Sequence, residues 1–215
     1  MRKKFIWKEP KLTADLQEVE NIFNEDFDDE IHELIAKNIQ KTDGDFFGYT
    51  FSKVRFLNCK FENASFERCY FDEVIFENCS FNQCNFRNSN FLIVKQINSL
   101  YRNTDFSESR FYCAGFVKCN MKYSNFTGCK FDGFQSLESD FNSTFFANCT
   151  INNSNYEKTS FNSADFFQTS LKGIDFSDCD IEGIIVSESK NELRGIIVNS
   201  FQALDLSSMF GIVIK

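Results

Sequence analysis

A five-residue period runs through the sequence from Phe46 to Val186, and it limits the possible folds more than any other feature. Stepping by five across these 141 residues gives 29 positions, of which 20 are Phe and only Gln96 and Ser136 are not large and apolar. An α-helix repeats every ~3.6 residues and an ordinary strand every two, so neither element produces this pattern. The chain must therefore be built from a unit five residues long.

Each five-residue unit carries a second inward position and a corner. Two residues before each period position the side chain is small or medium, as at Cys59, Ala64 and Val74. Two residues after it, Asn or Gly fills 13 of the 29 places, and both residue types tolerate turn conformations. One unit therefore has one large and one small inward residue and three outward residues. A unit this small cannot bury its own Phe, so the units must stack into a solenoid.

These units resemble the sequence pattern of the pentapeptide-repeat family. The resemblance implies an all-β fold, a right-handed quadrilateral β-helix in which four quintets form one coil. Residues 46–190 would then form about seven coils, and a strand spacing of ~4.8 Å would make the rod about 35 Å long. The resemblance rests on quintets such as Cys59-Lys60-Phe61-Glu62-Asn63, Ala64-Ser65-Phe66-Glu67-Arg68 and Ala164-Asp165-Phe166-Phe167-Gln168.

The nine cysteines raise the question of metal or redox chemistry. No Cys-x-x-Cys pair is present, and the spacings follow the five-residue period. We therefore expect buried, reduced, inert thiols, with a metal or redox role as the weaker alternative. Only Cys113 falls outside the small inward position, so it is the one thiol that we expect reagents to reach. The eight others are Cys59, Cys69, Cys79, Cys84, Cys119, Cys129, Cys149 and Cys179.

No group of residues resembles a catalytic or metal centre. His32 lies in a polar segment, and a catalytic base would need an oriented partner and a nucleophile. The acidic clusters at residues 26–29 and 43–45 lack the spacing of a calcium loop. We therefore predict no enzymatic activity, no metal, no cofactor and no small-molecule substrate.

Two weak quintets interrupt the Phe series at Gln96 and Ser136. They are 40 residues apart, so in the family geometry they lie on the same face, two coils apart. One interpretation is a local bulge in which Phe134 or Leu137 turns inward instead. The other is that Gln96, Phe134 and Ser136 mark a face modified for a partner.

The two ends of the chain lack the period, which divides the chain into segments 1–45, 46–190 and 191–215. Apolar residues between Leu12 and Ile39 recur at near-helical spacing, which predicts one or two amphipathic helices within residues 12–40. These helices would cap the open end of the solenoid, or else bind a partner.

At the C-terminus we expect a helix over residues 199–209, followed by a short apolar strand. An apolar tail on a chain with a finished core suggests a cap or a self-association patch. The residues expected to form a dimer contact are Phe201, Leu204, Leu206, Met209, Phe210, Ile212 and Ile214.

The C-terminal tail contains a Leu-x-Gly, an Asn-x-Phe-Gln-Ala and a closing Gly-Ile-Val-Ile, at residues 193–195, 199–203 and 211–214. In these features it resembles the tail of the Qnr quinolone-resistance proteins and their relative MfpA. The resemblance implies a two-fold dimer that binds type II topoisomerases, DNA gyrase or topoisomerase IV. It also implies protection of these enzymes from quinolones, with DNA mimicry as the mechanism.

Charge is distributed unevenly along the chain. The net charge is −8; residues 46–160 carry 12 bases and 11 acids, whereas residues 161–215 carry 8 acids and 4 bases. An acidic chain is a poor ligand for nucleic acid or an anionic membrane. The acids expected to face a basic partner are Asp165, Asp175, Asp178, Asp180, Glu182 and Glu188.

Two further features indicate location. No apolar stretch approaches the ~20 residues of a membrane span, and no apolar signal-peptide core follows the basic first residues. We therefore expect a cytoplasmic, non-enzymatic protein that binds a topoisomerase. The rival hypothesis is a repeat scaffold that binds another protein through its N-terminal helices.

Overall fold

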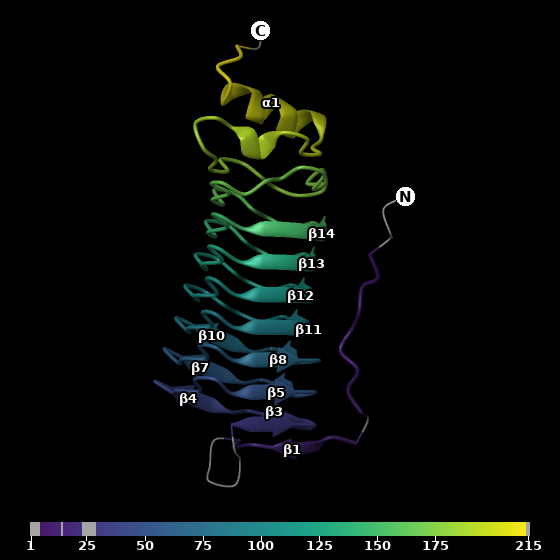
Figure 1. Ribbon diagram of the computed structural model, residues 1–215, viewed down its shortest axis with the longest axis vertical. Helices are drawn as coiled ribbons and strands as arrows, with labels where there is room; N and C mark the ends of the chain where they lie inside the picture. The colour runs from purple at the N-terminus through teal and green to yellow at the C-terminus, as the bar shows by residue number, and fades with distance from the viewer. Residues whose placement is uncertain (1–4, 14, 23–28, 214–215) are drawn as a thin grey trace.

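The computed structural model describes residues 5–13, 15–22 and 29–213. Short parallel strands stack into a rod, and one helix closes the end at which the chain terminates (Figure 1). The strands are β1 (Gln17–Val19), β2 (Glu30–His32), β3 (Leu34–Lys37), β4 (Gln40–Thr42), β5 (Thr50–Ser52), β6 (Arg55–Leu57), β7 (Lys60–Glu62), β8 (Tyr70–Asp72), β9 (Ile75–Glu77), β10 (Ser80–Asn82), β11 (Asn90–Ile97), β12 (Arg110–Val117), β13 (Lys130–Leu137) and β14 (Thr150–Glu157). The helices are a 3₁₀ turn, η1 (Asn191–Leu193), and α1 (Ser200–Ser208).

The strand register gives the length of one coil. Phe91 of β11 pairs with Phe71 of β8 on one side and with Phe111 of β12 on the other, an offset of 20 residues each time. Phe131 of β13 continues the same series. One coil therefore contains four quintets, which confirms the all-β solenoid expected from the period. The right-handed, quadrilateral form of the coil stays a prediction.

A left-handed backbone conformation recurs at the corner position of the quintets. Asn58, Asn78 and Asn98 have φ values of 55°, 54° and 49°. Asn adopts this conformation at lower cost than most residues, which explains its enrichment there. Ile93 and Cys113 take the same conformation, with φ values of 55° and 53°. Stacking on both sides therefore imposes the corner even where the side chain disfavours it.

The large inward residues form continuous columns of stacked rings. The ring centroids of Phe91 and Phe111 are 4.5 Å apart with an interplanar angle of 4°. Phe106 and Phe126 stack in the same way at 4.8 Å and 3°. Each of these side chains is at most 2% exposed. Removal of this apolar surface from water is the main driving force for stacking the coils.

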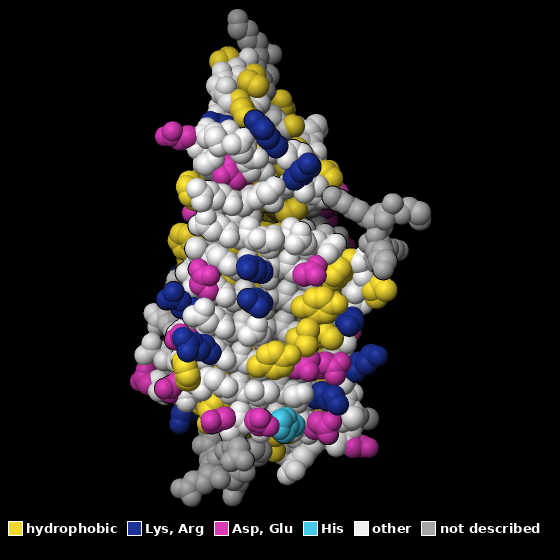
Figure 2. All heavy atoms as spheres, viewed as in Figure 1, with side chains coloured by type: hydrophobic (Ala, Val, Ile, Leu, Met, Phe, Trp, Pro, Cys, Tyr) yellow, Lys and Arg dark blue, Asp and Glu magenta, His cyan; other side chains and the backbone are white. Residues whose placement is uncertain are grey.

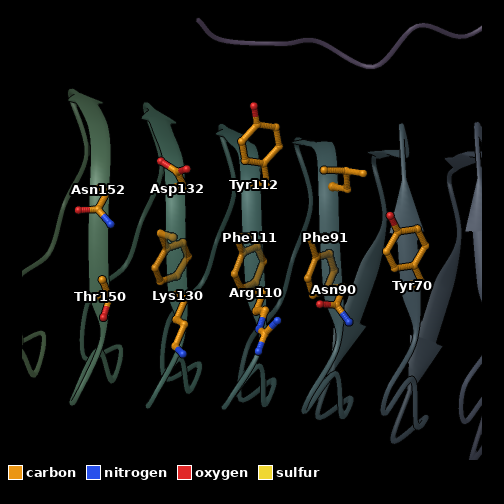
Figure 3. Close-up of a pocket in the computed structure, with 12 residues that line it drawn as sticks. Tyr70, Asn90, Phe91, Arg110, Phe111, Tyr112, Lys130, Asp132, Thr150 and Asn152 are labelled. Carbon is orange, nitrogen blue, oxygen red and sulfur yellow. The ribbon is translucent and has the colours of Figure 1, made fainter. Parts of the chain in front are cut away.

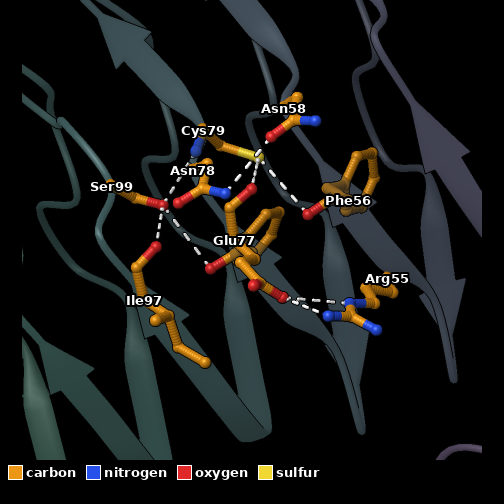
Figure 4. A network of polar contacts seen from close by, with 9 residues as sticks. Arg55, Phe56, Asn58, Glu77, Asn78, Cys79, Ile97 and Ser99 are labelled. Carbon is orange, nitrogen blue, oxygen red and sulfur yellow. Dashed lines mark hydrogen bonds and ion pairs between the residues drawn. The ribbon is translucent and has the colours of Figure 1, made fainter.

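The small inward residues form a polar ladder beside the rings. The Ser99 hydroxyl accepts a hydrogen bond from the Cys79 amide at 3.0 Å and donates one to the Ile97 carbonyl at 2.8 Å (Figure 4). The Cys79 thiol donates in turn to the Phe56 carbonyl at 3.4 Å. Where the position holds Ser, Thr or Cys, the short side chain satisfies buried main-chain groups. Ala64 and Val74 fill the same position through packing alone.

All nine cysteines are free thiols and all are buried. Burial raises the pKa of the Cys84 and Cys119 thiols to about 12. The expectation that Cys113 is open to reagents is wrong, because its exposed fraction is only 3%. Cys113 lies at a corner that another segment of the chain covers.

The N-terminal segment forms strands instead of the expected helices. The described part of residues 12–40 contains β1, β2, β3 and part of β4, and no helix. The five-residue frame extends back into this segment, because Ile31 and Ala36 occupy the large inward position and Leu34 and Ile39 the small one. Inward positions alternating at intervals of two and three residues produce apolar spacings that resemble those of a helix.

The start of the rod is closed by a strand. β1 pairs in parallel with β3, with Gln17 opposite Leu34 and Val19 opposite Ala36. Ile22, which follows β1, is fully buried in the core. Capping thus uses one added strand and one buried side chain.

The C-terminal helix is confirmed, and the strand predicted after it is wrong. α1 covers residues 200–208, close to the expected 199–209. Residues 209–211 form a turn and residues 212–213 have no regular structure. Ile212 and Val213 are 56% and 82% exposed, so they have no strand edge to pair with. Ile214 lies outside the described residues.

Candidate protein-interaction surfaces

The inner side of α1 closes the last coil. Asn199 caps the helix by accepting a hydrogen bond from the Gln202 amide at 3.0 Å, and Gln202 Oε1 accepts one from the Asn199 amide at 2.9 Å. Gln202 Nε2 also donates to the carbonyls of Phe176 at 2.9 Å and Cys179 at 2.6 Å. Leu206 is buried beside it. The Asn and Gln of the Asn-x-Phe-Gln-Ala motif therefore attach the helix to the coil.

The outer side of α1 and the tail beyond it are apolar and exposed. Phe201 is 77% exposed, and Leu204, Phe210 and Ile212 are each about half exposed. Of the other residues expected at a dimer contact, Leu206 is buried in the cap and Met209 is half-buried against the core. Val213 joins this surface although sequence reasoning missed it, and the closing Gly-Ile-Val-Ile was the available signal. We call Phe201, Leu204, Phe210, Ile212 and Val213 the C-terminal apolar patch.

The six acids expected to face a partner lie around the last coils. Asp180 and Glu182 flank Ile181 and line a groove of about 240 Å³ between the coil and α1. Asp205 of α1 lines the same groove, and sequence reasoning missed it because its place depends on how the helix docks. This acidic groove lies next to the C-terminal apolar patch, since Phe201 also lines it.

The other four acids lie on different sides of the rod. Asp165 accepts a hydrogen bond from the Phe167 amide at 2.8 Å, and Asp178 accepts one from the Lys158 amide at 3.2 Å. The Ser177 amide donates to Asp175 at 2.9 Å. Hydrogen bonding from the Ser177 side chain, and then from this amide, lowers the pKa of the Asp175 carboxyl. Glu188 is exposed after the following quintets. These carboxylates ring the C-terminal half of the rod and do not form one cluster.

In the weak quintet at Ser136, Phe134 fills the small inward position and Ser136 the large one. The register is unbroken, with Phe134 opposite Ala114, so the expected local bulge is wrong although Phe134 does point inward. Phe134 is fully buried and its ring stacks on Phe131 at 4.6 Å. Gly133, with φ of +93°, precedes it at the left-handed corner position of the quintet. Ser136 is buried with its hydroxyl 2.9 Å from that of Thr159. Gln96 is 1% exposed, so all three residues of the modified face point into the core.

An N-terminal segment lies across the outside of this modified face. Residues 5–13, which we call the N-terminal arm, run beside the ends of the long strands (Figure 1). Glu9 Oε2 accepts a hydrogen bond from Lys95 Nζ at 2.7 Å. Phe5 contacts Tyr112 of β12 edge to face, with ring centroids 6.2 Å apart. This contact could not be predicted from the sequence, because residues 5–13 lie outside the repeat.

A shallow groove runs along the neighbouring face. It has a volume of about 370 Å³, with a floor that includes Phe91 and Phe111. Arg110 and Lys130 lie along one side of the groove, and Tyr112 and other residues lie along the opposite side (Figure 3). Figure 2 shows hydrophobic side chains rising over β8, β11 and β12, above the single His.

The described part of the chain contains no cluster of three or more His, Cys, Asp or Glu side chains that could hold a metal. His32 is half exposed, 3.6 Å from the Glu30 carboxylate. No helix in the residues described is long and apolar enough to span a membrane.

The repeat identifies the family. The sequence matches the pentapeptide repeat region over residues 49–126 and an eight-copy pentapeptide-repeat pattern over residues 146–183, together more than half of the chain. The chain belongs to the pentapeptide-repeat family. This membership agrees with the 20-residue register and with the Phe columns described above.

Solved pentapeptide-repeat structures show distant likeness. Full-length QnrB1, a plasmid-mediated fluoroquinolone resistance protein, is 17% identical with a TM-score of 0.41, covering 91% of this chain and 95% of its own. HetL from the cyanobacterium Nostoc sp. strain PCC 7120, a protein involved in heterocyst differentiation regulation, is 9% identical with a TM-score of 0.28, covering 72% and 85%. No curated protein matches the sequence significantly. At these values the likenesses bear on neither partner nor function.

Proposed function

We propose that this protein is a non-enzymatic DNA mimic that binds a type II topoisomerase, DNA gyrase or topoisomerase IV, and protects it from quinolones, acting in the cytoplasm as a C-terminally joined homodimer. The observation that carries the proposal is the two-sided character of α1. Its inner side, with Gln202 and Leu206, closes the coil, and its outer side leaves Phe201 77% exposed. The tail motif that resembles the Qnr group is thus divided between a cap and a free apolar surface.

Self-association would bury the C-terminal apolar patch. A capped solenoid needs no further apolar surface at its end, so a cluster of large exposed side chains indicates a partner. A second copy is a self-complementary partner, because a two-fold axis through the patch places each residue opposite the same surface. The product would be a rod of double length.

The acids would then lie on both sides of the dimer centre. Asp180, Glu182 and Asp205 line the groove beside the patch, and residues 161–215 carry twice as many acids as bases. A rod with negative charge around its middle fits a basic surface that normally holds DNA. DNA mimicry would therefore use the acidic groove and the ring of acids near it.

The rival hypothesis of a scaffold that binds through N-terminal helices loses its basis. The described residues of that segment form strands of the solenoid and an extended arm. A partner at that end would meet β1 and the buried Ile22.

A supercoiling assay tests the proposal. Gyrase and topoisomerase IV are each titrated with ciprofloxacin, with and without the full-length protein. We expect the protein to restore activity at drug concentrations that stop the enzyme alone. Bovine serum albumin at equal concentration is the control for non-specific protection. Identical drug titrations with and without the protein, for both enzymes, would contradict the proposed function.

A further inference from the structure

One corner of the rod is buried only over two coils. The residues stacked along it are Ile93, Cys113, Gly133 and Asn153, the corner positions of β11 to β14. Cys113 and Gly133 are buried, whereas Ile93 is half-buried and Asn153 is exposed. Since the coils are equivalent, something outside them must cover the two middle positions.

Phe5 of the N-terminal arm is that cover. A Cβ atom placed on Gly133 would lie 2.6 Å from Cζ of Phe5 and 3.2 Å from Cα of Cys113. The missing side chain of Gly133 therefore leaves the space in which the Phe5 ring lies. The ring is held laterally by Tyr112 and by Trp7, whose centroid is 5.0 Å away.

Two charged residues extend the contact along the arm. Lys8 Nζ lies 5.5 Å from the ring centroid of Tyr112, a cation–π distance. Glu9 pairs with Lys95, which is next to Gln96 on β11. The arm residues described here make no main-chain hydrogen bond to the coils. The coils therefore bind the arm through its side chains.

We propose that this corner is a docking site for an extended segment, which the chain's own residues 5–9 occupy reversibly. Recognition requires an aromatic ring in the space at Gly133, a cation over Tyr112 and a carboxylate at Lys95. The tether makes occupancy intramolecular, at an effective concentration in the millimolar range. The arm covers the outer surface of the modified face, so a partner that binds there must first displace it.

The test uses the full-length protein and two substitutions in the arm. Phe5→Ala removes the ring from Gly133, and Ile6→Ser is the matched control because Ile6 is 77% exposed. The readout is the rate at which a thiol reagent labels Cys113, with the eight inward cysteines as internal standards of an intact fold. We expect Phe5→Ala to raise the Cys113 rate at least about tenfold, because the Phe5 ring is the group that lies over this corner. Ile6→Ser should leave it unchanged.

Two further measurements distinguish a docking site for extended segments from an arm that only covers the corner. Trp7 is the only Trp in the chain, so its emission should shift to the red in the Phe5→Ala variant. A synthetic peptide of residues 5–11 (Phe-Ile-Trp-Lys-Glu-Pro-Lys), added at about millimolar concentration, should restore protection of Cys113 in that variant. A scrambled peptide should not.

Each contrary result overturns a defined part of the proposal. Equal Cys113 labelling in the wild type and Phe5→Ala would show that the arm does not cover the corner. Faster labelling without rescue by the peptide would show a cover and no docking site for extended segments. Neither result depends on topoisomerase binding, so the proposed function would be unaffected.

Discussion

At the residue scale, each inward side chain is defined by its neighbours 20 residues away. Phe91 stacks on Phe71 and Phe111, and Ser99 serves the Cys79 amide in the same register. The composition of the quintet follows from these two contacts. A large apolar residue fills the space between coils, and a small side chain packs beside the backbone, which it also hydrogen-bonds where it is Ser, Thr or Cys. The sequence therefore predicted the large and small inward positions and the burial of eight thiols. The inertness of those thiols stays a prediction.

Residues outside the repeating contacts were not predictable in this way. Cys113 appeared open because it occupies a corner, and only the fold shows Phe5 lying over it. Asp205 lies in the acidic groove and Val213 in the C-terminal apolar patch because of how α1 docks on the last coil. A local pattern describes what a quintet buries, and it contains no information on segments that return from far along the chain.

Truncation of an inward ring should be costly. Phe116 is 1% exposed and contacts the rings of Phe126, Phe134 and Phe141. Phe116→Ala should lower the free energy of unfolding by ~3–5 kcal/mol, through lost burial and a cavity. Urea denaturation measures this change. The control is Glu67→Ala at an outward position, for which we expect about ±0.5 kcal/mol. Equal losses at the two sites would mean that the inward frame is misassigned.

The buried thiols should make stability fall at alkaline pH. In the folded protein burial raises the pKa of Cys84 and Cys119 to about 12, from an ordinary value of 9.0. The folded state therefore keeps protons that the unfolded state loses, so stability is full below pH 9 and declines as pH rises above it. Melting temperatures between pH 8 and pH 11 measure the decline. A Cys84→Ala/Cys119→Ala variant should show a shallower decline, and an identical pH profile would contradict this origin.

At the element scale, the secondary structure at the C-terminal end of the solenoid was predictable from the sequence, and that at the N-terminal end was not. The helix α1 was predictable because Asn199 and Gln202 have the spacing of a capping box. The N-terminal strands were not, because Ile31, Leu34 and Ile39 have spacings that also fit a helix. Pairing with β5 and β6 decides between the two, and such pairing is not visible in a local window.

Gln202 should be a main determinant of the C-terminal cap. Its side chain donates to two buried carbonyls and accepts from one amide. Gln202→Ala removes the donor to the Cys179 carbonyl, whereas the Phe176 carbonyl keeps its hydrogen bond from the Cys179 amide at 2.9 Å. We expect a loss of roughly 1–3 kcal/mol in the free energy of unfolding. Ala203→Ser, on the exposed side of the same helix, should change it by no more than about 0.5 kcal/mol. Chemical denaturation compares the two, and equal stabilities would show that the cap is held by apolar contacts alone.

At the scale of the whole molecule, the C-terminal apolar patch and the acidic groove should act separably. Phe201→Asp places a charge in the patch, where burial without a partner is unfavourable. We expect a monomer with an intact solenoid, measured by light scattering and circular dichroism. Phe167→Asp, which changes an exposed ring away from the patch, is the matched control. A Phe201→Asp dimer of unchanged affinity would mean that this surface does not mediate self-association.

Charge reversal in the groove should weaken partner binding without affecting assembly. We expect Asp180→Lys/Glu182→Lys to remain dimeric and to bind gyrase less tightly at low salt. The difference from the parent should shrink as salt rises, since exposed charges are screened over ~10 Å at 0.1 M. Glu67→Lys/Glu73→Lys is the matched control, with the same change in net charge far from the groove. Equal losses for both double variants would point to net charge alone and against the acidic groove.

Because of the 20-residue register, insertions or deletions of whole coils change the length of the rod in fixed steps. Removing or duplicating one whole coil shifts every later residue by a single strand spacing, ~4.8 Å, and leaves each face in its place. Removing one quintet would instead rotate everything beyond it by one face. Insertions and deletions in multiples of 20 thus alter reach at constant orientation. Duplication or loss of whole coils is therefore sufficient to change the distance between the two ends of the rod.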